Sequence, residues 1–242
     1  MSEKTKAIFS WSGGKDSAYC LNKVLTENKY DVKYLLTTLN HEFKRISMHG
    51  VREELLDAQA EAIGIPQLKV WVSDGTNDEY ERQMEAILIK AKSEGIEHVI
   101  FGDIFLDDLR KYREQNLAKV GMIGVFPLWL TNTTALIKDF IDQQFKTITC
   151  CISNKFLDGT WVGREIDSVF IDQLPPDVDP CGENGEYHTF CYEAPIFRNR
   201  ILFTIGEKVF RPIILNPTNE NINEVGTNLG FWFCDLVPTN LT

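Results

Sequence analysis

Five short apolar segments alternate with segments of helical periodicity over the first 130 residues, and this alternation constrains the fold more than any other feature. The apolar segments have the length of buried strands and lie at 7–12, 32–39, 68–72, 98–102 and 124–129. Between them, apolar residues recur at helical spacing at 16–27, 52–63, 78–93 and 106–120. Strands that alternate with helices imply βαβ units, so we expect an α/β fold whose parallel five-stranded sheet carries helices on both faces.

After about residue 131 the pattern changes to a mixture of helices, strands and one long loop. We expect helices at 134–144 and 166–173, strands at 146–152, 200–205 and 208–215, and a loop rich in Pro, Gly and Asp at 174–186. The sequence therefore predicts two domains, a larger α/β domain over residues 1–130 and a smaller α+β domain over residues 131–242.

The acidic balance and the lack of long apolar segments limit the classes of partner. Asp plus Glu number 35 against 25 Lys plus Arg, which gives a formal net charge of −10. A large nucleic-acid interface normally needs clustered Lys and Arg, so a nucleic-acid partner is not expected. The sequence shows neither an apolar signal-peptide core nor an apolar run of membrane-spanning length. Six scattered cysteines without a CxxC pair are typical of reduced thiols in a cytoplasmic protein.

The segment between the first strand and the first helix has the composition of a phosphate-binding loop. Its residues are Ser12, Gly13, Gly14, Lys15, Asp16 and Ser17. The two glycines permit a sharp turn and a close backbone approach to a ligand, and the N–H groups at the helix start suit phosphate oxygens. Lys15 adds a positive charge, whereas Asp16 could hold Mg²⁺ or orient Lys15. An ordinary glycine turn is the alternative, and the spacing is not that of a kinase-type P-loop or a dinucleotide-binding fold.

This loop resembles the phosphate-binding motif of PP-loop ATP-pyrophosphatases, and later segments resemble one branch of them, the diphthine–ammonia ligase family. The later segments are Ser47-Met48-His49-Gly50, Gly102-Asp103-Ile104, Phe126-Pro127-Leu128-Trp129, Asp179 to Phe190 and Ala194-Pro195-Ile196-Phe197. The resemblance implies a HUP-like sheet, of the adenine nucleotide alpha hydrolase-like kind, joined to a smaller acceptor-binding domain. It also implies ATP and Mg²⁺ as cofactors, and a reaction in which a carboxylate is adenylated, pyrophosphate leaves and ammonia forms an amide.

One departure from the family pattern leaves the acceptor open. Members assigned to diphthamide formation have Gly-Gly-Glu-Tyr/Phe-Glu where this chain has Asn184-Gly185-Glu186-Tyr187-His188. The GENGEYH version resembles a separate, mainly bacterial branch for which corrinoid salvage has been suggested. Diphthine, a corrinoid carboxylate or another small or protein-borne carboxylate therefore remain as acceptors. Free ammonia is the expected nitrogen donor, and a homo-oligomer is one option for the assembly.

The segment after the fourth strand combines acidic and basic residues. Gly102 and Asp103 end that strand, and helical spacing places Arg110 and Glu114 on one side of the following helix, with Asp107 nearby. The alternative is a surface ion-pair ladder. Beside the strand end, we expect Asp103, Arg110 and Glu114 to act in catalysis together with Lys15 from the phosphate loop. Asp103 shares with Asp16 an expected role as a Mg²⁺ ligand, because Mg²⁺ prefers oxygen donors.

The segment from residue 181 to residue 188 concentrates polar groups in a loop that prolines stiffen. We expect Glu183, Asn184, Glu186 and His188 to bind the acceptor or to transfer protons. A structural loop is the first alternative, and a metal site, which lacks a visible third ligand, is the second. His49, after the second strand, is expected to contact adenosine, with a structural histidine as the alternative.

Two other functions remain in view for the chain as a whole. A PP-loop enzyme that modifies tRNA would adenylate a base carbonyl, but the acidic balance and the missing CxxC pair disfavour it. A non-catalytic sensor would bind an adenine nucleotide without releasing pyrophosphate, and the charged residues between 103 and 114 disfavour that function.

Overall fold

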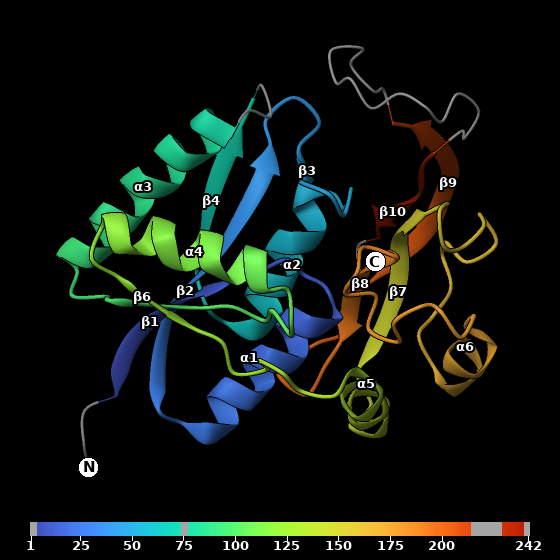
Figure 1. The fold of residues 1–242 in the computed structure, drawn as a ribbon, viewed down its shortest axis with the longest axis horizontal. Coiled ribbons are helices and arrows are strands. Elements are labelled where there is room, and N and C mark those ends of the chain that lie inside the picture. Colours follow the sequence, from blue (N-terminus) through green and yellow to red (C-terminus); the bar gives the residue numbers. More distant parts are fainter. Residues whose placement is uncertain (1–3, 74–76, 214–228, 240–242) are drawn as a thin grey trace.

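The computed structural model describes residues 4–73, 77–213 and 229–239, whose strands form two β-sheets (Figure 1). The first sheet and its helices comprise β1 (Thr5–Ser10), α1 (Lys15–Glu27), β2 (Tyr30–Asn40), β3 (Arg45–Ile46), α2 (Glu53–Ile63), β4 (Gln67–Val72), α3 (Asn77–Ser93), β5 (His98–Ile100), α4 (Asp107–Lys119) and β6 (Ile123–Val125). The second sheet and its helices comprise α5 (Thr133–Asp142), β7 (Lys146–Ser153), α6 (Ser168–Gln173), β8 (Tyr187–Glu193), β9 (Phe203–Pro212) and β10 (Gly230–Pro238).

The first sheet contains the five parallel strands that the sequence predicts, in the order β4-β2-β1-β5-β6. A sixth strand, β3, pairs antiparallel with the end of β2 and was not predicted. Two residues are too few to produce a periodic pattern, so no sequence signal marks this strand. The order places β1 at the centre of the sheet, where Phe9 lies beside both Leu35 and Ile100.

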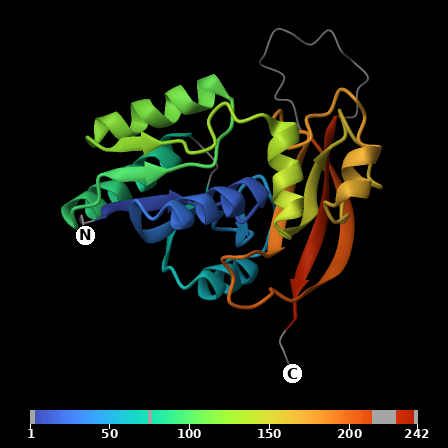
Figure 2. The same ribbon diagram turned by 90° about the horizontal axis from the view of Figure 1, so that it is seen from below.

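Helices cover both faces of the first sheet, as expected for parallel strands (Figure 2). On one face, Ile8 and Leu36 pack with Leu88 of α3 and Leu117 of α4. The helices α1 and α2 pack on the other face, where Phe9 of β1 faces them. Ile8 and Phe9 therefore point into two separate apolar layers, which is why the buried middle of β1, Ala7 to Phe9, is apolar.

The second sheet is antiparallel, with the order β8-β7-β10-β9. It confirms a smaller α+β unit after the first sheet, but its strands differ from the expected ones. β8 lies in the segment that was noted only for its polar motif, and β10 was not predicted. β9 is one unbroken strand where two runs were expected, and residues 214 and 215 of the second run lie outside the described residues.

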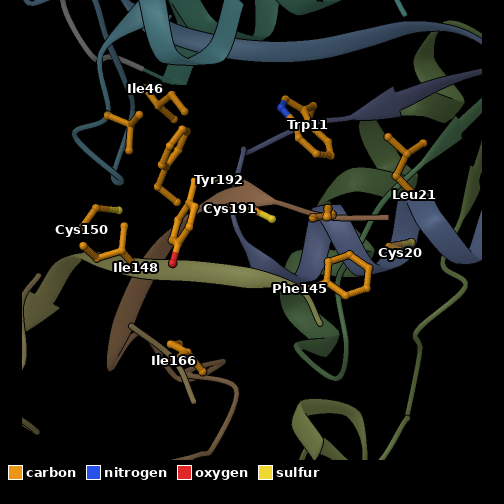
Figure 3. Packing of buried hydrophobic residues seen from close by; sticks show 14 of the residues in the cluster. Trp11, Cys20, Leu21, Ile46, Phe145, Ile148, Cys150, Ile166, Cys191 and Tyr192 are labelled. Atoms are coloured by element: carbon orange, nitrogen blue, oxygen red, sulfur yellow. The ribbon is translucent and has the colours of Figure 1, made fainter. Parts of the chain in front are cut away.

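One apolar cluster runs through both sheets (Figure 3). It includes Trp11 and Leu21 from the first part of the chain, together with Phe145, Ile148 and Tyr192 from the second. The predicted boundary near residue 130 falls between β6 and α5, and the cluster extends across it. All six cysteines are free thiols with buried side chains. Among the described helices, none combines the length and apolar character needed to cross a bilayer.

A buried glutamine of α2 joins the first sheet to the second. Gln59 is fully buried, and its side-chain N–H groups donate to the carbonyl oxygens of Gly13, at 3.0 Å, and Cys191, at 2.5 Å. Its Oε1 accepts a hydrogen bond from the Trp11 indole at 3.0 Å. Gly13 follows β1 and Cys191 belongs to β8, so this single amide connects the loop after β1 to the second sheet.

We expect Gln59→Ala to lower the free energy of unfolding by about 2–4 kcal/mol, because it leaves buried polar groups unpaired and a small cavity. The matched control is Gln115→Ala on the exposed side of α4, for which a change within about 0.5 kcal/mol is expected. Urea denaturation of both variants measures the difference. Equal stabilities for the two variants would contradict the connecting role of Gln59.

Candidate active site

A cavity of about 610 Å³ lies where the carboxyl ends of β1 and β5 meet the second sheet. Its lining combines three motif segments: Ser12, Gly14, Lys15, Asp16 and Ser17 from the loop after β1, Gly102 and Asp103 after β5, and residues 181–185, 187 and 188 before and within β8. A Cβ added to Gly102 would lie 3.1 Å from the Asp16 carbonyl oxygen. Because the backbones approach so closely at Gly102, the loops after the first and fourth parallel strands lie side by side.

The glycines of the phosphate loop allow it to pack tightly against β8. Gly13 has a φ of 76°, which disfavours residues with a Cβ, and a Cβ on Gly14 would lie 3.1 Å from the Thr189 carbonyl oxygen. The Cys191 N–H donates to the Gly13 carbonyl at 2.8 Å, and the Lys15 N–H donates to Thr189 Oγ1 at 2.9 Å. β8 therefore holds the loop through the Cys191 backbone and the Thr189 side chain, and Thr189 also lines the cavity.

The start of α1 presents donors to the cavity. Gly14 is the N-cap residue and has no side chain to accept hydrogen bonds from the first turn. Ser12 and Ser17 line the same cavity, and their hydroxyl oxygens lie 3.1 Å apart. The Lys15 N–H is bonded to Thr189 Oγ1, but the positive end of the helix dipole and the nearby hydroxyls favour an anion such as phosphate.

Lys15 is a buried cation paired with its sequence neighbour. Its side chain is 3% exposed, and Nζ lies 2.8 Å and 2.6 Å from the two carboxylate oxygens of Asp16. Burial acts to lower the pKa of Lys15, but the charge of Asp16, assisted by Glu183, outweighs it and raises the pKa. Lys15 is therefore held charged at the cavity wall, and Asp16 orients it, which is one of the two roles considered for Asp16.

Asp103 pairs with an arginine other than the expected one. Arg113 Nε lies 2.6 Å from Asp103 Oδ2, and the Arg113 guanidinium stacks over the Phe101 ring at 4.4 Å. Both charged residues line the cavity. Arg113 lies four residues after Leu109 and four residues before Leu117, so it falls on the apolar stripe of α4. That stripe is the sequence signal that could have identified Arg113 as a cavity residue.

Arg110 and Glu114 pair with each other and do not belong to the cavity lining. Arg110 Nε lies 2.9 Å from Glu114 Oε1, and the guanidinium stacks over Phe126 at 4.7 Å and Trp129 at 4.6 Å. The catalytic role expected for Arg110 and Glu114 stays a prediction, but the structure places Arg113 and not these two residues in the cavity lining with Asp103. One helical turn later, Arg113 reaches the position that had been assigned to Arg110.

The loop before β8 is held by a buried carboxylate. Glu186 is fully buried, and its oxygens accept hydrogen bonds from the backbone N–H groups of Asp179, at 3.0 Å, and Asn184, at 2.8 Å. The Asn184 side chain donates a third hydrogen bond at 3.0 Å. Glu186 thus lies outside the cavity lining, whereas Asn184 lines the cavity, and acceptor binding by these residues stays a prediction.

Glu183 lines the cavity opposite the phosphate loop. Burial raises the pKa of Glu183 to about 8, with a further contribution from the nearby charge of Asp16 and opposition from Lys15 and the Ile104 N–H. Glu183 therefore lies close enough to the phosphate loop for the charges of Asp16 and Lys15 to affect its pKa.

Two histidines from different parts of the chain stack on each other at the cavity wall. The rings of His49 and His188 have centroids 4.6 Å apart and planes inclined by 29°. His49 Nδ1 lies 3.2 Å from the Thr189 carbonyl oxygen. Burial lowers the pKa of His49 to about 4, and burial together with the neighbouring His49 and Lys15 lowers the pKa of His188 to about 3. Both rings are therefore neutral at pH 7.

A second cavity of about 390 Å³ adjoins the first. It is mainly apolar and lies over the ends of β1 and β2, against α3 and α4, with Trp11, Leu36, Met84 and Leu88 in its lining. The two cavities share the lining residues Ser10, Ser12, Met48, His49, Phe101, Leu109, Arg113 and His188. The shared residues mark the junction, where the apolar cavity opens toward the phosphate loop.

The carboxylates of the larger cavity suit a magnesium ion that a ligand brings with it. Among the described residues, no group of three His, Cys, Asp or Glu side chains forms a metal site of its own. Mg²⁺ commonly uses one or two carboxylates together with substrate phosphates and waters. Asp16 and Asp103 line the cavity beside the phosphate loop, so they fit that mode of binding.

Comparison with known proteins relates most of the chain to one family. A model described as the diphthamide synthase N-terminal domain matches residues 5–123, and one described as the diphthamide synthase C-terminal domain matches residues 132–213. The diphthine–ammonia ligase of Rattus norvegicus is 25% identical over 223 residues, which cover 82% of each chain. The diphthine–ammonia ligases of Homo sapiens and Danio rerio are 24% and 23% identical, with 82% of this chain covered and 82% and 86% of theirs.

The two buried histidines predict an acid-sensitive fold. The unfolded chain takes up protons at these residues near pH 6.5, whereas the folded chain does so only near pH 4 and below. The free energy of unfolding should therefore fall between pH 6.5 and pH 4, by up to about 1.4 kcal/mol per pH unit for each histidine. The raised pKa of Glu183 acts in the opposite sense, because it makes the free energy of unfolding rise as the pH falls over part of this range. The wild type is therefore compared with His188→Phe, which contains the same Glu183 and keeps the ring stack. Urea denaturation at several pH values should give a shallower acid decline for the variant, and parallel curves would contradict this account.

Proposed function

This chain belongs to the diphthamide synthase family, and we propose that it is an ATP-dependent ligase that adenylates a carboxylate and joins it to ammonia. The observation that carries the proposal is the arrangement of charge in the larger cavity. Lys15, the start of α1 and Arg113 supply positive charge and N–H donors to one space, next to an apolar cavity of adenosine size. Such an arrangement suits a nucleotide whose phosphates meet the loop and whose base is buried.

In the proposed complex, adenosine occupies the apolar cavity and the β and γ phosphates bind at the loop after β1. The α-phosphate then lies at the junction of the two cavities, near Arg113 and the stacked pair of His49 and His188. Asp16 and Asp103 would hold a magnesium ion on the phosphates, which would neutralise charge on the leaving pyrophosphate. Ser12, Gly14 and Lys15 provide the remaining contacts to the pyrophosphate oxygens.

The proposed reaction proceeds in two steps. A carboxylate oxygen of the acceptor attacks the α-phosphorus, the bond to the β-phosphate oxygen breaks, and pyrophosphate leaves with the bonding electrons. Ammonia then attacks the acyl carbon, the bond from that carbon to the AMP oxygen breaks, and one proton is lost as the amide forms. Lys15 and the α1 N-terminus stabilise the charge that develops on pyrophosphate, and the enclosed cavity aligns the reactants.

The acceptor is a carboxylate that reaches the larger cavity past Glu183, Asn184 and His188. The relatives are named for diphthine, a carboxylate carried on a protein. A corrinoid acid is the other acceptor that the GENGEYH pattern brings forward. Both candidates require the same adenylation chemistry, so the reaction class can be tested without first choosing between them.

A product assay tests the proposal. Purified protein is incubated with Mg·ATP, ammonium and either diphthine-bearing elongation factor 2 or corrinoid acids, and the nucleotide products are separated. Acceptor-dependent AMP and pyrophosphate are the expected products. ADP and phosphate would overturn the adenylation chemistry, and nucleotide binding without turnover on any acceptor would favour the sensor function.

We expect Lys15→Met to reduce AMP formation by about 10²–10³-fold, because a buried charge that stabilises the leaving pyrophosphate is lost. The matched control is Lys23→Met on the exposed side of α1, with a change of no more than about twofold. AMP production is measured at saturating acceptor, and thermal unfolding of both variants checks that the fold is kept. Near-normal turnover of the Lys15 variant would remove Lys15 from the mechanism.

The two arginines of α4 provide a second test. Arg113→Gln should reduce AMP formation by about 10–100-fold, because Arg113 lines the cavity where the α-phosphate is proposed to lie. Arg110→Gln removes the same charge one helical turn earlier, outside the cavity lining, and should change turnover by no more than a few-fold. A larger loss in the Arg110 variant would return the catalytic role to Arg110.

A further inference from the structure

One histidine of the stacked pair has its tautomer fixed by the backbone. His49 Nδ1 lies 3.2 Å from the carbonyl oxygen of Thr189. A carbonyl oxygen only accepts hydrogen bonds, so Nδ1 carries the proton and Nε2 of the neutral ring has a free lone pair. Within the described part of the chain, no hydrogen bond is formed to Nε2. His49 is therefore oriented in the manner of a proton acceptor.

The position of His49 places this lone pair where the second reaction step would occur. His49 lines both cavities, and it lies at the junction that the α-phosphate occupies in the proposed complex. The acyl-adenylate joins the acceptor to that same phosphate, so its acyl carbon lies at the junction as well.

His188 supports the ring of His49 but is not oriented in the same way. It stacks on His49 with centroids 4.6 Å apart, and within the described residues its own ring makes no hydrogen bond to the protein. The stack on its face and the hydrogen bond at its Nδ1 fix the ring of His49. The two rings differ in this respect although both line the same cavities.

We propose that His49 is the general base that removes a proton from ammonium in the amide-forming step. This inference rests on the proposed ligase function and names a catalytic residue for its second half. Nε2 accepts one proton from NH₄⁺, and the ammonia lone pair forms the C–N bond to the acyl carbon. The bond from that carbon to the AMP oxygen breaks with its electrons on AMP, and a second nitrogen proton passes to solvent. Nucleotide phosphates next to the ring favour its protonated form, which assists the transfer.

The nitrogen nucleophile provides the decisive experiment. Hydroxylamine is largely unprotonated at neutral pH, so it attacks an acyl-adenylate without needing the base and yields a hydroxamate. The test variant is His49→Asn, whose side-chain N–H group can still donate to the Thr189 carbonyl but which has no counterpart of Nε2. With ammonium, amide formation should fall by about 10²–10⁴-fold, and with hydroxylamine, hydroxamate formation should stay within a few-fold of the wild type.

The comparison variant is His188→Phe, which keeps the stacked ring and removes both nitrogens. It should lose much less of the ammonium reaction than His49→Asn does. Equal losses with both nucleophiles in His49→Asn, or a selective loss of the ammonium reaction in His188→Phe alone, would overturn the assignment. Acceptor-dependent exchange of pyrophosphate into ATP separates the two levels of the proposal. If the wild type shows no such exchange, adenylation itself is overturned. If His49→Asn keeps both the exchange and the full ammonium reaction, only the role of His49 as the general base is overturned.

Discussion

The structure depends on the contact between β8 and the loop that follows β1. In that contact the Cys191 N–H donates to Gly13, Thr189 accepts from the Lys15 backbone, and Gln59 joins the same two segments through its amide. Each of these groups is buried, so the loss of any one of these hydrogen bonds would destabilise the contact. The phosphate loop is thus shaped by the second sheet as much as by β1 and α1, and the cavity exists only when both parts of the chain are folded together.

The same arrangement keeps two cations charged in a largely buried site. Lys15 is paired with Asp16 and Arg113 with Asp103, and each carboxylate reduces the cost of removing its partner from water. Anionic phosphates that enter the cavity compete with these carboxylates for the cations. A magnesium ion bound with the phosphates would in turn provide Asp16 and Asp103 with a new positive partner. The ion pairs therefore suit the metal-bound polyphosphate that we propose as the ligand.

The parts of the fold that the sequence predicted are those with a strong local signal. The parallel strands and the phosphate loop have such signals, because burial on both faces makes a strand uniformly apolar and a sharp turn needs glycine. The short β3 has no periodicity, and β8 is hidden because its polar motif residues interrupt the apolar pattern. Glu186 was assigned to the acceptor because a sequence does not distinguish a carboxylate that faces a cavity from one that accepts backbone N–H groups in the interior. Arg113 was overlooked because its role depends on which face of α4 meets the sheet.

The division of roles within the loop before β8 explains how acceptor recognition could change while the fold stays the same. The family pattern assigned to diphthamide formation and the pattern of this chain agree at Gly185, Glu186 and Tyr187 and differ at Asn184 and His188. Gly185 has a φ of 84°, Glu186 and Tyr187 are buried, and the Tyr187 hydroxyl donates to the Pro180 carbonyl at 2.5 Å, so the shared positions determine the shape of the loop. The two differing positions line the cavity, as do the shared Gly185 and Tyr187. A neutral imidazole at residue 188, in place of a carboxylate, removes a negative charge from the cavity wall. The loop can therefore keep its conformation while the charge that it would offer to the proposed acceptor changes.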